Sequence, residues 1–229
     1  MPRTPDDFRV GESVDESFFQ RQARDVARDL IGTLLVNDTD EGRVGGLVVE
    51  TEAYVNAVDP ACHLTAGRTA RTEPFFSGAG TVYVFVMHGH AALNFITAAG
   101  DHPEGVLVRA LEPTHGVDVM RERRGYDDPA LLASGPGRLT EALDVTKADY
   151  DDRPLAETSL SVHRTDWHPD VDVTGRVGVT SAADWPLRYV AADSDYVSSP
   201  PPDVDLDHDA VEDAYDRLAE DDLPTVDDA

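Results

Sequence analysis

The stretch VVETEAYVNAVDPACH, residues 48–63, begins as an apolar strand and ends as a polar loop. Two carboxylates and a tyrosine, Glu50, Glu52 and Tyr54, close the strand, and His63 follows eleven residues after Glu52. A buried charge is costly unless it is paired or used in chemistry. A strand that serves only the core has no need of these side chains. The stretch therefore predicts a strand that ends in a functional site.

Strand signals dominate the rest of the chain. Residues 33–37 and 43–54 flank DTDEG, residues 38–42, and predict a β-hairpin. Other predicted strands lie at 80–87, 105–113, 160–164, 173–180 and 186–192, and predicted helices at 15–32, 117–124 and 137–143. Asp15 is the expected N-cap of the first helix, and Gly32 its end. Because helices do not alternate with strands, the fold class is α+β, a single domain with a curved, mostly antiparallel β-sheet flanked by helices.

The formal charge of −26 is concentrated at the end of the chain. Residues 191–229 hold 14 acids and one base, and the chain has one lysine, Lys147, beside eighteen arginines. We expect residues 1–197 to form the domain and residues 198–229 to be an acidic, disordered tail with one weak helix. An acidic, lysine-poor chain indicates a halophilic protein. Because the Debye length is about 3 Å in molar salt, this charge does not exclude DNA as a partner.

Other classes of protein receive little support. No apolar run is long enough to span a bilayer and no signal peptide is present, which predicts a cytoplasmic protein without a membrane partner. We also expect a monomer. Cys62 is the only cysteine, so no disulfide can form within the chain. His88 and His90 suggest a metal-dependent hydrolase, but they lack a recognisable ligand spacing, and we expect no metal and no cofactor.

Single residues still allow ordinary structural explanations. Glu52 and Arg109 could form a salt bridge with each other, since each interrupts an apolar strand. Tyr83 and Phe85 alternate along a strand and could belong to the core, and His63 could be an ordinary loop histidine. The residue types alone do not decide between these readings and a site.

The ordered set of motifs resembles the alkyladenine DNA glycosylase family, also called the 3-methyladenine or methylpurine DNA glycosylases. The matching strings are LIGTLLV, VVETEAY, DPACH, PFFSGAGTVYVF, the asparagine of LNF, GVLVRALEP, SGPGRL and RVGV, within residues 24–190. The resemblance implies base-excision repair, in which a damaged purine is flipped out of double-stranded DNA and its N-glycosidic bond is hydrolysed. The implied partner is therefore duplex DNA that contains alkylated bases.

The resemblance also implies roles for individual residues. Glu52 matches the catalytic carboxylate, a general base for water, and Arg109 matches the arginine beside that water. The residues matching the purine pocket are Tyr54, His63, Phe85 and Asn94. A single lysine outside the site makes a Schiff-base lyase improbable, so we expect a monofunctional enzyme that leaves an abasic site.

Two positions depart from the family pattern. His88 stands where a tyrosine usually intercalates into the gap left by the flipped base, and Phe85 replaces a more usual tyrosine. The candidate contacts to the DNA backbone are Arg68, Arg71, Arg138 and Lys147. The arginines between residues 121 and 124 could equally line a solvated helix face. The alternative function is a non-catalytic nucleic-acid-binding module of the same fold.

Overall fold

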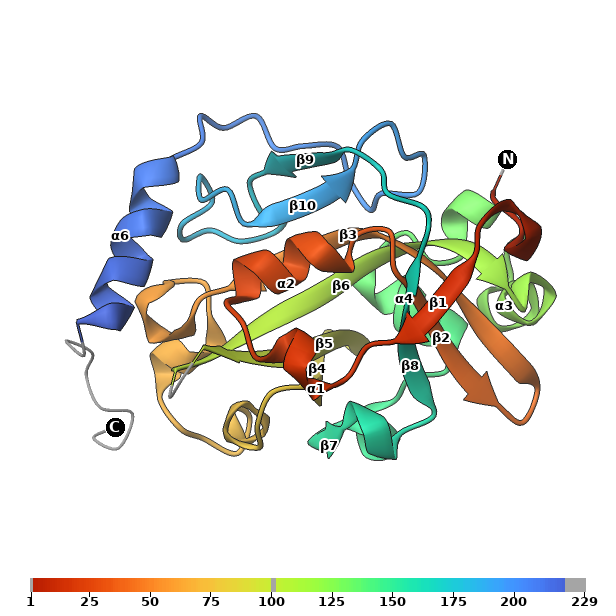
Figure 1. Ribbon diagram of the computed structural model, residues 1–229, viewed down its shortest axis with the longest axis horizontal. Coiled ribbons are helices and arrows are strands. Elements are labelled where there is room, and N and C mark those ends of the chain that lie inside the picture. The colour runs from red at the N-terminus through yellow and green to blue at the C-terminus, as the bar shows by residue number, and fades with distance from the viewer. Residues whose placement is uncertain (1, 100–101, 221–229) are drawn as a thin grey trace.

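Strand β3 (Gly42–Tyr54) runs through the centre of the fold and pairs with three other strands (Figure 1). Along one edge it pairs first with β2 (Leu34–Thr39) and then with β10 (Arg188–Ala191), while β6 (His102–His115) follows the other edge. This confirms the predicted hairpin of β2 and β3. Because side chains alternate along a strand, Glu50 and Glu52 project from the same face of β3.

The computed structural model describes residues 2–99 and 102–220. The other strands are β1 (Val10–Ser13), β4 (Thr81–Met87), β5 (His90–Ala99), β7 (Arg153–Pro154), β8 (Leu160–Thr165) and β9 (Val171–Thr174). They follow the order β1-β8-β2-β3-β6-β5-β4-β7, with β9 joined to β10. The sheet curls into an antiparallel half-barrel, which confirms the predicted α+β class and the single domain.

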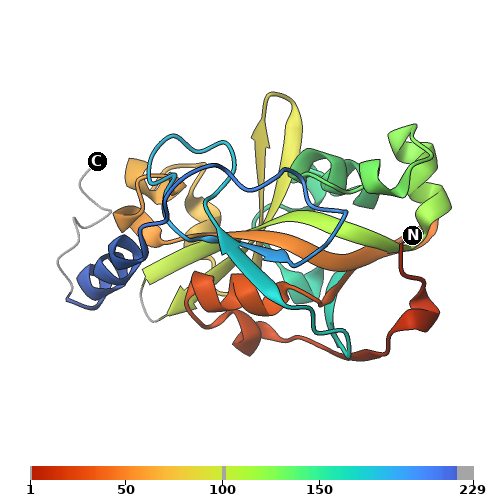
Figure 2. The same cartoon turned by 90° about the horizontal axis from the view of Figure 1, so that it is seen from above.

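In the part of the chain that the structure describes, six helices flank this sheet, and short 3-10 turns lie in its loops. The helices are α1 (Glu16–Phe19), α2 (Ala23–Leu30), α3 (Val117–Arg124), α4 (Pro136–Leu143), α5 (Lys147–Tyr150) and α6 (His208–Ala219). The 3-10 turns are η1 (Pro5–Asp7), η2 (Asn56–Val58), η3 (His63–Ala66), η4 (Glu73–Phe76), η5 (Pro129–Leu131) and η6 (Leu155–Glu157). In Figure 2, α1 and α2 cover one face of the sheet, while α3 and α4 lie over the opposite face.

The predicted helix over residues 15–32 is wrong in one respect, because the structure has two helices there. Asp15 caps α1 as expected, accepting a hydrogen bond from the Ser17 N–H at 3.0 Å. The chain turns after Phe19, which packs against Phe95. The second helix starts where the buried Glu104 carboxylate accepts the Ala23 N–H at 2.5 Å. A tertiary cap from β6 thus decides where α2 begins.

Two strand assignments also change. Strand β5 is absent from the prediction because its alanine-rich sequence has a weak strand preference; pairing with β4 and β6 on its two sides supports it instead. The predicted strand over residues 173–180 ends at Thr174, the last residue of β9. The chain then leaves the sheet because Arg176 turns inward to bond Asp59.

The described part of the expected tail contains the helix predicted there, α6, but it is packed against the domain and does not lie free in solvent. Ser198 bonds the buried Glu50, and α6 buries Val211, Ala214, Tyr215 and Leu218. The Tyr215 hydroxyl donates to Glu104 at 3.2 Å, so the helix is attached to β6. The sequence predicts solvent exposure for this segment because its acidic residues greatly outnumber the four apolar residues that α6 buries. Residues 221–229, the end of the expected tail, lie outside the described residues.

The apolar residues form one main core, a smaller one beneath the loops, and a third cluster of Phe8, Leu34, Val36 and Leu47. The main core joins residues of α2, β3, β6, α4 and α6. The smaller one consists of Cys62, Leu64, Phe75, Tyr83 and Ile96, with Tyr54 and Phe85 at its border. Within residues 2–99 and 102–220, no helix combines the length and apolar character needed to cross a membrane.

Candidate active site

A cavity of about 270 Å³ opens beside the smaller core. Four aromatic rings and a histidine line it, those of Tyr54, Phe75, Tyr83, Phe85 and His63. Its remaining lining comes from Ala61, Cys62, Met87, Ala92, Asn94, Gly105, Leu107, Arg109, Pro136, Val177, Gly178 and Val179. Burial raises the pKa of the Cys62 thiol, so this residue contributes an apolar wall and no nucleophile. The cavity is concave, mostly apolar and has a few polar groups, as small-molecule pockets do.

The Glu52 carboxylate lies directly behind the wall of this cavity. It is fully buried and makes three contacts. Its Oε2 accepts the Tyr54 hydroxyl at 2.8 Å and the Arg109 Nη1–H at 3.3 Å, and its Oε1 accepts the Val177 N–H at 2.7 Å. All three donors belong to residues that line the cavity. Burial and the Glu52 charge raise the pKa of Tyr54, so the phenol stays protonated as a donor.

Arg109 bonds Glu50 more closely than Glu52. Its Nε–H donates to Glu50 Oε1 at 2.9 Å, against 3.3 Å from Nη1 to Glu52. The salt bridge between Arg109 and Glu52, which the sequence leaves open, is therefore present. The shorter ion pair of Arg109 is with Glu50. Burial alone would lower the pKa of Arg109, but the charges of Glu52 and Glu50 raise it. Bulges in β3 and β6 beside these residues bring the three side chains together.

A second buried pair, which the sequence did not reveal, lies under Tyr54. Arg176 donates to both Asp59 oxygens, at 2.5 and 2.8 Å, and both side chains are fully buried. Its guanidinium carbon lies 4.8 Å from the centre of the Tyr54 ring. The pair therefore fixes the loop after β3 and the ring together. The sequence marks Arg176 through the string RVGV, residues 176–179, but that string was used only as part of the family resemblance and did not indicate the pairing with Asp59.

His63 and Phe85 form one wall of the cavity. Their ring centres are 4.4 Å apart, and His63 Nδ1 lies 2.9 Å from the Tyr83 hydroxyl. Burial, with a smaller effect of Arg71, lowers the pKa of His63, so its ring favours the neutral form. Tyr83, buried in the smaller core, supports His63 from below. The structure thus brings Tyr54, His63 and Phe85 to one cavity.

Asn94 lines the same cavity and points its amide nitrogen at the backbone. Its Nδ2 donates to the carbonyls of Tyr83 and Ala92 at 3.1 and 3.0 Å. The register of β4 with β5 places Asn94 opposite Tyr83. These bonds fix the rotamer, so the amide occupies a defined part of the floor.

The sequence model of the methylpurine-DNA glycosylase family matches residues 17–195 of the chain. The chain belongs to this family. Three similar relatives share the name "Putative 3-methyladenine DNA glycosylase". That of Rhodopseudomonas palustris (strain ATCC BAA-98 / CGA009) is 40% identical over 88% of this chain and 97% of its own length. Those of Bacillus subtilis (strain 168) and Methanoculleus marisnigri are 43% and 44% identical, each over 80% of this chain and over 94% and 96% of their own lengths.

In this methylpurine-DNA glycosylase family member, His88 lies at the tip of the β4–β5 hairpin. The hairpin stands out from the sheet (Figure 2), and His88 and Gly89 form its turn with φ values of 52° and 84°. His88 is exposed, and the neighbouring Met87 is 58% exposed. A projecting tip with an exposed apolar neighbour is suited to insertion between stacked bases.

The four candidate contacts to the DNA backbone have different surroundings. Arg71 is exposed, with its guanidinium carbon 5.6 Å from the Phe85 ring centre at the cavity wall. Arg68 forms a salt bridge with Glu73, and Arg138 donates to the Ser134 hydroxyl at 3.1 Å. Lys147 pairs with Asp151 on α5, against β4. Arg71 therefore has the position best suited to a strand entering the cavity.

The arginines of α3 are engaged in ion pairs within the protein. Arg121 bonds Asp118, Arg123 bonds Glu41 and Arg124 bonds Glu141. The structure therefore places this run on a helix face whose arginines have partners within the protein. The histidines at 88 and 90 gain no further ligand, since no group of three metal-ligating side chains forms among residues 2–99 and 102–220.

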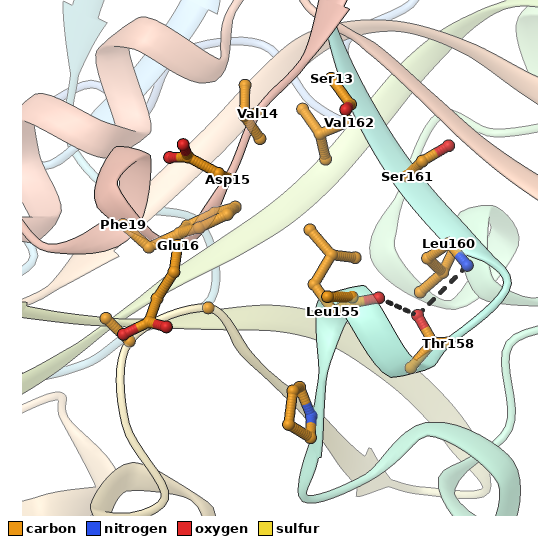
Figure 3. Close-up of a pocket in the computed structure, with 14 residues that line it drawn as sticks. Ser13, Val14, Asp15, Glu16, Phe19, Leu155, Thr158, Leu160, Ser161 and Val162 are labelled. Carbon is orange, nitrogen blue, oxygen red and sulfur yellow. Dashed lines mark hydrogen bonds between the residues drawn. The ribbon is translucent and has the colours of Figure 1, made fainter.

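A separate cavity of about 350 Å³ lies among α1, β8 and the turn at η6 (Figure 3). Its apolar lining includes Phe19, Leu155 and Val162, and its charged residues are Asp15 and Glu16. No arginine, lysine or histidine belongs to its described lining. Lacking a cation, it is poorly suited to a nucleic-acid phosphate. Of these two cavities, the one lined by Tyr54, His63 and Phe85 is therefore the better candidate for the active site.

Proposed function

We propose that this protein is a monofunctional DNA glycosylase that excises alkylated purines flipped out of duplex DNA. The observation that carries the proposal is the position of Glu52, held by Tyr54, Arg109 and Val177 at the back of a ring-lined cavity. A carboxylate with a purely structural role would not need all three of these hydrogen-bond donors to come from residues that line one cavity. Family membership supports the same reaction class.

In this proposal Glu52 is the general base. It takes a proton from a water molecule whose oxygen bonds to C1′ of the flipped nucleotide, while the C1′–N bond breaks and the purine leaves with the electron pair. A positively charged alkylated purine leaves as a neutral base, so little acid catalysis is needed. The Arg109 contact is the longest of the three to Glu52. Arg109 then holds the water and the nucleotide's backbone.

In this proposal the aromatic rings of the cavity recognise the flipped purine. A purine between Tyr54 on one side and His63 and Phe85 on the other gains about 1–3 kcal/mol per stacked contact. A cationic lesion gains more, because ring faces attract positive charge. Asn94, with its amide bonded to the backbone, crowds the exocyclic amine of normal guanine. His88 fills the gap in the duplex and Arg71 contacts the phosphates.

The position of Lys147, the only lysine in the sequence, supports a monofunctional reaction. A lyase would need an amine that attacks C1′, but Lys147 lies on α5, paired with Asp151, and does not line the cavity. The product is therefore an abasic site in an uncut strand.

The test uses duplexes that each contain one 3-methyladenine analogue, 7-methylguanine, hypoxanthine or ethenoadenine. Chromatography in molar KCl identifies released bases, and gel electrophoresis before and after alkali shows whether the strand is cut. The proposal expects a free base and a strand break only after alkali. Binding to these duplexes without any released base would instead identify a non-catalytic module, and breaks before alkali would identify a lyase.

A further inference from the structure

The buried network at Glu50 includes a residue of the segment that follows β10. Glu50 is fully buried and accepts four hydrogen bonds. Two come from guanidinium groups, Arg109 Nε at 2.9 Å and Arg188 Nε at 2.8 Å. The other two come from Ser198, its N–H at 2.5 Å and its hydroxyl at 2.8 Å. One residue thus supplies half of the donors to this carboxylate.

The Ser198 hydroxyl also accepts hydrogen bonds from Arg109. The distances are 3.1 Å from Nη2 and 3.4 Å from Nε. The hydroxyl therefore connects the two groups, donating to Glu50 and accepting from Arg109. Seen from Arg109, Glu50 and Ser198 hold Nε and Nη2, and the remaining nitrogen, Nη1, faces Glu52.

The segment that carries Ser198 is held on both sides of that residue. Tyr196 is buried, and the Ser199 carbonyl accepts a hydrogen bond from Arg188 Nη2 at 2.6 Å. A Cβ built on Gly135 would lie 4.0 Å from that of Ser198, so the segment passes close to the loop before Pro136 of the cavity lining. Ser198 lies three residues beyond the matched family region, residues 17–195.

We infer that Ser198 is a positioning residue that sets the orientation of the Arg109 guanidinium toward Glu52 and the attacked sugar. The inference rests on the proposed function. A planar guanidinium has five N–H donors in a fixed fork, so two fixed nitrogens direct the third. Without the hydroxyl, Arg109 keeps its bond to Glu50 but is free to tilt, and Nη1 loses its direction.

The test compares Ser198→Ala with Ser198→Thr and with the matched control Ser199→Ala. Ser198→Ala keeps the backbone N–H bond to Glu50, and Ser199 uses only its carbonyl in this network. Single-turnover release of hypoxanthine or a methylated purine reports the chemical step, and affinity for duplex with an abasic analogue reports binding. We expect release by Ser198→Ala to be slower by about 10- to 100-fold, the value of a hydrogen bond to a charged group, with affinity changed by less than about twofold. Ser198→Thr recovers most of the rate, and Ser199→Ala matches the wild type.

A double-mutant cycle with Arg109→Lys identifies the route of the effect. If Ser198 acts through Arg109, adding Ser198→Ala to Arg109→Lys causes little further loss of rate. Full additivity overturns the inference, as does an unchanged rate of Ser198→Ala or an equal fall in rate and affinity. Failure of the wild type to release any base overturns the proposed function and this inference together, whereas a fast wild type with a fast Ser198→Ala variant overturns the positioning role alone.

Discussion

Tyr54 donates its hydroxyl hydrogen to Glu52 at 2.8 Å, although the two residues are only two positions apart on the same strand. Their side chains share a face of β3, so the phenol leans back over the carboxylate while its ring lines the cavity. One ring thus joins the lining of the cavity to the proposed general base, and a change at Tyr54 would alter both.

Replacing Glu52 with glutamine tests the general base. We expect release of alkylated purines to fall by at least about 100-fold, because an amide cannot take a proton from water. Binding to duplex with an abasic analogue should persist, since the amide keeps nearly the same shape. Glu12→Gln, at an exposed residue of β1, is the control and should leave both measurements unchanged. Turnover of Glu52→Gln at the wild-type rate would refute the role.

The hairpin tip offers a separate test of base extrusion. Flipping costs a few kcal/mol, and a larger ring at position 88 should offset more of it by stacking. We expect His88→Tyr to release bases from duplex several-fold faster and from single strands at the wild-type rate. The single-stranded substrate is the internal control, because it needs no extrusion. Slower release from duplex alone would contradict a wedge at this position.

The Arg176–Asp59 pair should dominate the stability of the cavity wall. Asp59→Asn leaves Arg176 as a buried charge without its anionic partner, which costs about 3–5 kcal/mol. Urea unfolding followed by circular dichroism measures this loss. Asp118→Asn, in which the side chain is 91% exposed and pairs with Arg121, should change stability by less than about 0.5 kcal/mol. Similar losses in the two variants would be inconsistent with a structural role for the buried pair.

Glu104 should make the stability depend on pH. Burial raises its pKa from 4.5 to about 7, while hydrogen bonds from the Ala23 N–H and the Tyr215 hydroxyl act in the opposite direction. Because the folded pKa lies above the unfolded one, the folded state binds the proton more tightly. The contribution of Glu104 to the free energy of unfolding is greatest below pH 4.5 and falls by about 3 kcal/mol as the pH rises to about 7.

Glutamine at position 104 should remove that dependence. In Glu104→Gln the unfolding free energy should lose this slope between pH 4.5 and 7 and exceed the wild-type value at pH 8. The same slope in both proteins would show that another group titrates. Following α6 through the fluorescence of Trp185, which borders it, would report whether the helix detaches first.

The acidic, lysine-poor composition predicts a salt requirement. In molar KCl the Debye length of about 3 Å suppresses repulsion within a chain of charge −26, so the midpoint of thermal unfolding should rise steadily from dilute buffer. Equal stability and activity in dilute buffer would contradict this expectation. Sodium chloride at matched ionic strength separates screening from effects of the potassium ion, because the anion stays the same.

Local patterns were sufficient to predict the strands around VVETEAY, the hairpin before them and the α+β class, because apolar alternation and turn residues act over a few positions. The ordered motifs also placed Tyr54, His63, Phe85 and Asn94 together as an expectation, and the structure does bring them to one cavity. Only the tertiary structure decided the partners of the buried charges. Arg109 turned out to bond Glu50 more closely than Glu52, and Arg176 to bond Asp59, which is 117 positions away.

The segment from Ser198 to α6, predicted to be a tail, shows the same limit of prediction from local sequence. Its acids and prolines predict solvent exposure, yet Ser198 completes the Glu50 network and α6 buries one side of its surface. Composition measures the average preference of a segment for water. A few apolar contacts or one satisfied buried carboxylate can outweigh that average, and the groups that provide them come from strands far away in the sequence. The sequence therefore determined which residues could do chemistry, and the packing of β3 against β6, β10 and the final segment decided which of them meet.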